Sequence, residues 1–237
     1  MEPQTCIELR DVTFAWPGEP ALLDISRLTV SQGEKLFLKG ASGSGKSTLL
    51  GLIAGVLSPR SGLISVLGQD QAQAGGSQRD HLRANRLGVI FQMFNLVPYL
   101  SVLQNVALPC RFSPDRARRV SENGGVNAEA RRLLAQLGLH EPSLLSRSVS
   151  ALSVGQQQRV AAARALIGQP DLIIADEPTS ALDADSRDRF IALLNAQVDA
   201  SGATLVFVSH DGGLAGQFDR ALDLTTLNRA ARRQRTD

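Results

Sequence analysis

The spacing of apolar residues along the chain predicts two kinds of β-strand. Residues 7–14 roughly alternate between apolar and polar side chains, and after a turn at residues 16–18 an apolar pattern resumes at residues 28–30. This alternation is typical of antiparallel strands that bury one face. Later apolar runs, each followed by a helical pattern, indicate parallel strands buried on both faces. These runs are residues 36–38, 88–91, 172–175 and 205–208.

Helical spacing is clearest after the third of these runs. One stripe of a helix, which we expect to end near residues 201–202, contains Phe190, Leu193, Leu194, Gln197 and Val198. Between residues 93 and 154 the sequence has no strand-like run, and residues 128–134 have a purely helical pattern. The chain is therefore predicted to be an α/β protein with an inserted helical subdomain.

Two segments have the composition of surface loops. Residues 69–80 are rich in Gln, Gly and Ala, and residues 121–125 place two glycines between helical segments. We expect neither segment to carry chemistry. His81 and His140 match no motif and are predicted to be surface residues.

The composition of the 237 residues is that of a folded protein, with 43% hydrophobic and 20% charged residues. A net charge of +2 is too small to indicate a nucleic-acid surface, so no nucleic-acid partner is expected. Residues 229–235 are locally basic. We interpret this end as solvated, with contact to an anionic membrane surface as the alternative.

The cysteines and the apolar runs indicate the compartment. Cys6 and Cys110 are far apart and lack the partners of a metal or redox motif, which favours two thiols in a reducing compartment. No apolar run approaches the ~18 residues of a membrane span, and the first residues do not resemble a signal peptide. We expect a cytoplasmic chain that does not cross a membrane alone.

Residues 40–48 match the phosphate-binding loop pattern in full, between a predicted strand and a predicted helix. The glycines permit a tight turn that points backbone N–H groups inward, and the helix N-terminus adds positive charge. Lys46 is expected to bridge the β- and γ-phosphates, and the Ser47 hydroxyl to bind Mg²⁺. The alternative is a glycine-rich turn without function. The residues of the loop are Gly40, Ala41, Ser42, Gly43, Ser44, Gly45, Lys46, Ser47 and Thr48.

Two adjacent carboxylates follow the apolar run 172–175, at the strand end where open α/β sheets bind ligands. We expect Asp176 to hold Mg²⁺ and Glu177 to act as general base for an attacking water. The alternative is a solvated strand end. The chain lacks the Asn-Lys-x-Asp motif that reads guanine in P-loop GTPases, so guanine specificity is not expected.

Residues 152–158 read Leu-Ser-Val-Gly-Gln-Gln-Gln and distinguish between classes of phosphate-loop protein. This segment is one of five features that occur in the order of motifs in the ABC ATPase family. The other four are the phosphate loop, Gln92, the carboxylate pair at 176–177 and His210. The chain resembles this family over nearly its whole length. The family signature usually reads Leu-Ser-Gly-Gly-Gln, so Val154 departs from it; crowding, or a disfavoured positive φ, is expected to weaken closure.

This resemblance implies a fold and an assembly. The fold is a RecA-like P-loop NTPase core (1–92 and 160–227) with an N-terminal antiparallel β-subdomain, an inserted α-helical subdomain (93–159) and a basic tail (228–237). Two copies of the chain would enclose two ATP molecules as a homodimer, each lending its signature to the nucleotide held by the other. The residues implied at the shared nucleotide are Ser153, Gly155, Gln156 and Asp183. A capping box of Ser153 and Gln156 is the alternative for the signature.

The resemblance also implies roles for three further side chains. Gln92 would reach Mg²⁺ and the attacking water, and His210 would contact the γ-phosphate near Glu177. The alternatives are a polar strand end and an ordinary loop histidine. Trp16 is positioned to stack on adenine, or else to plug the edge of the β-subdomain.

Residues 91–98 and 105–109 resemble the lipoprotein-releasing and macrolide-efflux branch of the family. The apolar stretch 93–100 either packs within the helical subdomain or lines a groove for a short cytoplasmic helix of a membrane permease on a separate chain. The implied function is ATP hydrolysis that powers this permease from the inner face of the cell membrane. Alternatives are a soluble ABC ATPase acting on nucleic acid or ribosomes, and a regulatory module without turnover, which would lack Glu177.

Overall fold

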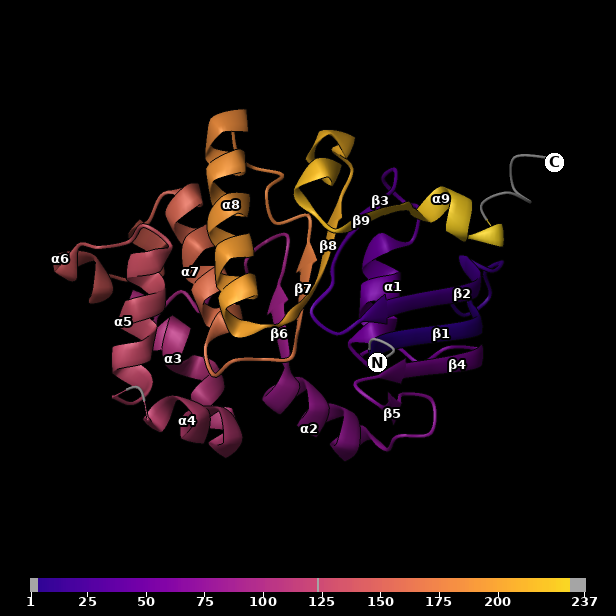
Figure 1. Ribbon diagram of the computed structural model, residues 1–237, viewed down its shortest axis with the longest axis horizontal. Helices are drawn as coiled ribbons and strands as arrows, with labels where there is room; N and C mark the ends of the chain where they lie inside the picture. Colours follow the sequence, from indigo (N-terminus) through magenta and orange to yellow (C-terminus); the bar gives the residue numbers. More distant parts are fainter. Residues whose placement is uncertain (1–3, 123, 231–237) are drawn as a thin grey trace. The chain divides into compact units, whose positions relative to one another are not determined.

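The computed structural model describes residues 4–122 and 124–230, which form two compact units (Figure 1). Unit 1 comprises Met1–Arg83 and Thr204–Asp237, and unit 2 comprises Ala84–Ala203. Residues 231–237 of the predicted basic tail and residue 123 of the predicted loop lie outside the described residues. The subdomain boundaries expected from the sequence stay a prediction.

An antiparallel sheet in unit 1 confirms the first strand prediction. Its strand order is β2-β1-β4-β5. A turn after β1 has Glu19 N donating to Trp16 O over 3.0 Å, with Gly18 at φ 78° as the third residue of a type II turn requires. The strands are β1 (Thr5–Phe14), β2 (Leu23–Ser31), β4 (Ser61–Val66) and β5 (Gln69–Asp70).

Parallel strands also form in unit 1, where β3 (Lys35–Lys39) pairs with both β8 (Thr204–Ser209) and β9 (Arg220–Asp223). The apolar centre of β3 is fully buried, as its unbroken apolar run predicts. After β3 the chain enters α1 (Lys46–Ile53), which packs against β4. The unit also contains η2 (Gly212–Gln217) and α9 (Leu224–Leu227).

Unit 2 consists of two parallel strands and a set of helices. β6 (Leu87–Ile90) pairs with β7 (Leu172–Asp176), and α7 (Val154–Leu166) packs against β6 and the neighbouring helices. Gly88 allows this contact, because a Cβ there would lie 2.3 Å from the Ala165 carbonyl oxygen. The other helices are α3 (Val102–Phe112), α4 (Pro114–Ser121), α5 (Val126–Gln136), α6 (Pro142–Leu145), η1 (Val149–Ala151) and α8 (Ala184–Ser201).

The end of α8 lies where the sequence places it, with Gly202 as a left-handed C-cap at φ 66°. Throughout residues 4–122 and 124–230, each helix is too short or too polar to cross a lipid bilayer. Both cysteines are buried thiols, and burial raises the pKa of the Cys110 thiol above its usual range.

The prediction of a loop at residues 69–80 is wrong in part. Its first two residues form β5, and residues 76–80 belong to α2 (Gly76–Arg86). Most of α2 is polar and Leu82 is its buried apolar residue, so apolar periodicity does not reveal the helix. The side-chain oxygen of Gln78 accepts from Gly75 N over 2.9 Å at the start of the helix. His81 and His140 are exposed, as predicted.

Arginine side chains attach α4 to the rest of unit 2. Arg116 is fully buried and donates to the carbonyl oxygens of Leu87 and Ile167, the latter over 2.9 Å. Burial lowers the pKa of Arg116 to about 10. Arg119 donates to the carbonyl oxygen of Gly168 over 2.6 Å. Hydrogen bonds to backbone carbonyls, in addition to apolar packing, therefore fix α4 against β6 and the end of α7.

Replacing Arg116 by alanine should lower the free energy of unfolding by about 3 kcal/mol, because two buried carbonyl groups lose their donor. The control is Arg118→Ala on the same helix, where an exposed guanidinium pairs with Asp115 over 2.6 Å. An exposed pair contributes about 0–1 kcal/mol. Urea denaturation measures both variants, and equal stabilities would contradict the role given to Arg116.

Candidate functional site

The phosphate loop of unit 1 bends between β3 and α1. Ser44 N donates to Ala41 O over 3.2 Å, and Gly45 is the N-cap of α1 at φ 93°. Gly43 also has a positive φ, 77°. Glycine adopts this left-handed backbone without the steric penalty that other residues have. The loop therefore turns back onto the N-terminus of α1, and the first N–H groups of a helix lack partners within the helix and favour an anion.

The loop is tightly packed and has no room for side chains at two of its glycines. A Cβ at Gly40 would lie 2.6 Å from Ser44 Oγ, and one at Gly45 would lie 2.8 Å from Leu23 Cδ2. The buried Ser44 Oγ has no hydrogen-bond partner among the described residues. Lys46 is only 6% exposed, and its Nζ donates to Gly40 O and Ala41 O, each over 2.9 Å. A buried ammonium and a hydroxyl thus lie beside the backbone N–H groups.

The other expected site residues of unit 1 are accessible. Ala41, Ser42 and Ser47 are exposed, and Thr48 is half-buried in the first turn of α1. Trp16 is exposed, and its ring packs edge-on against the buried Phe14 with centroids 5.1 Å apart. That contact supports the tryptophan from one side and leaves it accessible for stacking.

His210 is exposed, immediately after β8. The parallel strand β3, paired with β8, leads into the phosphate loop. His210 and Lys46 therefore both belong to unit 1 and follow neighbouring parallel strands.

The acidic pair lies at the carboxyl end of β7 in unit 2. Asp176 is the last residue of β7, and both Asp176 and Glu177 are half-buried. Glu177 has φ 43°, a left-handed conformation that costs a residue with a side chain of order 1–3 kcal/mol. The turn behind it is closed by Ser180 N donating to Glu177 O over 3.2 Å. A strained residue held in this way is typical of a functional site.

Gln92 is exposed and begins a loop in unit 2. Phe94 and Asn95 have φ of 57° and 47°. Phe94 is buried, whereas Met93 is 82% and Tyr99 is 84% exposed. The apolar stretch 93–100 therefore contributes both to internal packing and to an accessible surface.

The signature residues form the N-terminus of α7. Ser153 is the N-cap, its Oγ accepting from Gln156 N over 3.3 Å, while Gln156 Oε1 accepts from Ser153 N over 3.0 Å. The capping box considered from the sequence is thus present. It leaves the Ser153 hydroxyl proton available to donate to an anion.

The expectation that Val154 disfavours a required positive φ is wrong. Val154 is the first helical residue of α7 and is not among the residues with positive φ. Its side chain is 47% exposed. At Gly155 a Cβ would meet Leu182 only at 3.8 Å, an ordinary contact. The departure at position 154 therefore does not distort the start of the helix.

Asp183 is the N-cap of α8. Its Oδ1 accepts from Ser186 N over 2.9 Å, and this hydrogen bond holds the pKa of Asp183 below its usual value. The exposed carboxylate has a structural role as a cap within the chain. Its expected place at a dimer interface stays a prediction.

The expected Mg²⁺ ligands are a hydroxyl at Ser47 in unit 1, and an amide at Gln92 and a carboxylate at Asp176 in unit 2. Within the part of the chain that the structure describes, no group of three His, Cys, Asp or Glu side chains could hold a metal ion. Mg²⁺ usually keeps several waters and binds one or two protein oxygens together with substrate phosphates. The three oxygen donors suit that kind of site, and their assignment stays a prediction.

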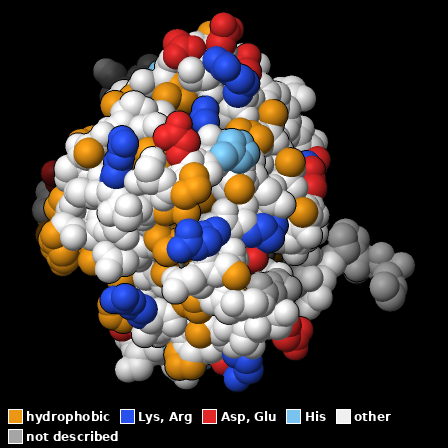
Figure 2. Space-filling model, turned by 90° about the vertical axis from the view of Figure 1, so that its left-hand side faces the viewer, with side chains coloured by type: hydrophobic (Ala, Val, Ile, Leu, Met, Phe, Trp, Pro, Cys, Tyr) orange, Lys and Arg blue, Asp and Glu red, His pale blue; other side chains and the backbone are white. Residues whose placement is uncertain are grey.

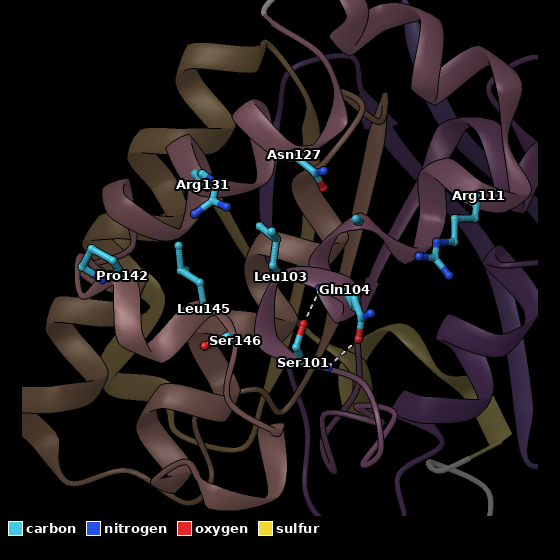
Figure 3. Close-up of a pocket in the computed structure, with 10 residues that line it drawn as sticks. Ser101, Leu103, Gln104, Arg111, Asn127, Arg131, Pro142, Leu145 and Ser146 are labelled. Atoms are coloured by element: carbon cyan, nitrogen blue, oxygen red, sulfur yellow. Dashed lines mark hydrogen bonds between the residues drawn. The ribbon is translucent and has the colours of Figure 1, made fainter.

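A pocket in unit 2 was not predicted from the sequence. It has a volume of about 400 Å³ and is lined by residues of α3, α5 and α6 (Figure 3). Arg111 and Arg131 are the charged residues among those lining it. Figure 2 shows the side of the molecule on which α5 and α6 lie in Figure 1, with basic and hydrophobic side chains mixed across its middle. Because three helices form the pocket, no single motif could have indicated it.

Comparison with protein families and curated proteins gives consistent matches. The family model described as ABC transporter matches residues 23–180. The lipoprotein-releasing system ATP-binding protein LolD 1 of Caulobacter vibrioides is 41% identical over 202 residues, which are 84% of this chain and 82% of that protein. The macrolide export ATP-binding/permease protein MacB of Chromobacterium violaceum is 39% identical over 92% of this chain and 33% of its own length.

A solved structure matches as well. The dimeric post-hydrolysis state of the ATP-binding cassette MJ0796, bound to ADP and Pi, aligns with a TM-score of 0.80 and 32% identity, covering 95% of each chain. The likeness confirms the predicted P-loop NTPase fold.

Lys46→Ala should weaken nucleoside triphosphate binding about tenfold to a hundredfold, because the ammonium supplies a charge-assisted hydrogen bond inside the loop. Lys39→Ala is the matched control, since Lys39 is exposed at the end of β3 and carries the same charge. Equilibrium dialysis with labelled ATP measures both affinities. Unchanged binding by the Lys46 variant would disprove the assignment of the phosphate loop.

Proposed function

Because the chain belongs to the ABC transporter family, we propose that it is the subunit that binds and hydrolyses ATP on behalf of a permease carried by a separate polypeptide. The proposal depends mainly on the buried Lys46 ammonium within the phosphate loop, in a chain that matches the family across that loop, its signature and its acidic strand end. The lipoprotein-releasing relative, aligned over 82% of its length, is itself named an ATP-binding protein.

Unit 1 supplies the residues for the nucleotide. The backbone N–H groups of the phosphate loop and the Lys46 ammonium bind the β- and γ-phosphates, and Trp16 stacks on adenine. Ser47, Gln92 and Asp176 would hold Mg²⁺, which when bound neutralises charge on the phosphate oxygens. His210 contacts the γ-phosphate and orients it.

Hydrolysis uses Glu177 as general base. Its carboxylate accepts a proton from water while the water oxygen forms a bond to the γ-phosphorus. The bond between that phosphorus and the bridging oxygen breaks, and ADP leaves with the electron pair. The left-handed backbone of Glu177, at φ 43°, sets the direction in which its side chain leaves the chain, which favours the geometry of attack.

A second copy of the chain completes each site. Ser153, Gly155 and Gln156 at the N-terminus of α7 bind the nucleotide held by the other copy, where the helix N-terminus favours an anion. Asp183 lies at the interface in this arrangement. The dimeric MJ0796 cassette structure bound to ADP and Pi supports this assembly.

The permease contacts the helical part of unit 2, so the subunit lies at the cytoplasmic face of the membrane. The exposed Met93 and Tyr99 supply apolar area, and the pocket beside α3 supplies two arginines. These features favour a cytoplasmic helix with apolar residues and a carboxylate directed at Arg111 and Arg131. The relatives reported above carry transporter names, so the alternative of action on nucleic acid or ribosomes is not retained.

Glu177→Gln should lower kcat for ATP hydrolysis by a factor of about 10² to 10⁴, because the amide cannot accept the proton. Binding of ATP should persist, and the variant should accumulate as a dimer in ATP and Mg²⁺. Phosphate release and size-exclusion chromatography measure these properties. Glu141→Gln, an exposed carboxylate at the start of α6, is the control. Wild-type turnover in the Glu177 variant would contradict the assignment of the base.

Placing a photo-crosslinking amino acid at position 131 should give an adduct with an integral membrane protein in intact cells, identified by mass spectrometry. The matched position is 118 on α4, also an exposed arginine that does not line the pocket. An adduct at 131 that contains only a soluble protein, or equal yields at both positions, would refute the proposed docking surface.

A further inference from the structure

One side chain of α7 holds the loop that follows Gln92. Arg164 Nη1 donates to Asn95 O over 2.7 Å, and Arg164 Nη2 donates to Phe94 O over 2.6 Å. The two carbonyl groups are adjacent in the chain, and the planar guanidinium fork of arginine matches such a pair better than an ammonium does. The contact therefore fixes the direction as well as the position of this backbone segment.

The backbone that Arg164 holds is strained. Phe94 and Asn95 have consecutive positive φ values, a conformation that costs a bulky residue such as Phe94 about 1–2 kcal/mol and that Asn adopts more readily. Two local hydrogen bonds, Phe94 N to Phe91 O and Asn95 N to Met93 O, close the turn. The surrounding structure must stabilise such a segment, and the guanidinium provides part of that stabilisation.

A second side chain, from α3, holds the far end of the loop by hydrogen bonds. Asn105 of α3 is fully buried; its Oδ1 accepts from Val97 N over 2.8 Å and its Nδ2 donates to Val97 O over 3.0 Å. The loop is thus attached to α3 near Val97 and to α7 at Phe94 and Asn95. Of these two attachments, the one from α7 lies nearer to Gln92 in the sequence.

The same helix begins at the signature. Ser153 caps α7, and Arg164 follows eleven residues later, which is about 16 Å along the axis of a helix. The helix is continuous between these positions and packs on β6 through Gly88. The helix is therefore a continuous connection between the backbone at 94–95 and the residues that form the signature.

We propose that Arg164 is a positioning residue that couples the Gln92 loop to the signature at the start of α7. The proposal rests on the proposed function. It adds a connection, within one chain, between the Gln92 loop and the signature. Movement of Gln92 toward the phosphates shifts the carbonyl groups of residues 94 and 95, and Arg164 carries that shift to Ser153. The state of the nucleotide bound by one copy thereby sets the orientation of the signature that it offers to the other.

Burial is consistent with this role. The Arg164 side chain is half-buried, and burial lowers the pKa of Arg164 from its usual value. Partial removal of a guanidinium from water costs free energy unless hydrogen bonds compensate for it. Both carbonyl oxygens belong to the loop, so the arginine loses compensation if the loop moves without it. Loop and helix are therefore expected to move together.

The test compares Arg164→Met, which removes the donors, with Arg164→Lys, which keeps the charge and can reach one carbonyl. We expect the Met variant to bind ATP within about twofold of wild type, because the phosphate loop belongs to unit 1. Its kcat should fall about tenfold or more at similar KM. This kinetic pattern is expected when the lost interaction acts after substrate binding. The Lys variant should recover part of the lost kcat. Arg159→Lys on the same helix is the control.

Hydrogen–deuterium exchange supplies a readout that mere destabilisation would not give. In wild type, ATP with Mg²⁺ should protect amides in 92–96 and in 152–156 together. In Arg164→Met, ATP with Mg²⁺ should still protect the amides of 92–96 but should no longer protect those of 152–156. Joint protection retained in the Met variant, or unchanged kcat, would overturn the coupling. If wild type itself does not hydrolyse ATP, the proposed function fails, while loss of joint protection still tests Arg164 separately.

Discussion

Backbone carbonyl groups at the ends of strands and in loops need hydrogen-bond donors once they are buried, and in this chain basic side chains supply many of them. Lys46 donates to two carbonyls of the phosphate loop. Arg116 and Arg119 do the same for residues at the ends of β6 and α7, and Arg164 for the loop after Gln92. The positions of the functional loops depend on these contacts as much as on apolar burial. A phosphate group near Lys46 would offer stronger acceptors than the carbonyls, so the proposed ATP site would use the same ammonium that now holds the loop.

Features encoded by short segments could be predicted from the sequence. The strands, the helix ending at Gly202 and the phosphate loop each depend on residues adjacent in the chain, and the structure confirms them. The helix α2 was missed because it buries little apolar surface. The contact of Arg164 with Phe94 joins residues 70 positions apart, and no local pattern encodes such a pair. Conversely, the concern over Val154 came from a motif, whereas the helical backbone at that position accepts a branched side chain.

The helix α7 explains why several motifs depend on one another. Four alanines on it, at 161–163 and 165, are buried, and the backbone of Ala165 approaches β6 closely at Gly88. Its N-terminus presents Ser153, and Arg164 in its last turn reaches the loop after Gln92. A change in the packing of this helix would therefore alter the strand end before Gln92, the loop and the signature at once. Such shared dependence makes the effects of mutations here non-additive.

The two buried cysteines have a practical consequence for spectroscopy. Cys6 and Cys110 are nearly inaccessible, and the raised pKa of Cys110 keeps its sulfur in the protonated, poorly nucleophilic form at neutral pH. Maleimide dyes and nitroxides should therefore react with an engineered surface cysteine in preference to the native thiols. Distance measurements between labels on two copies of the chain can then be made with both native cysteines in place, without repacking the interior around replacements.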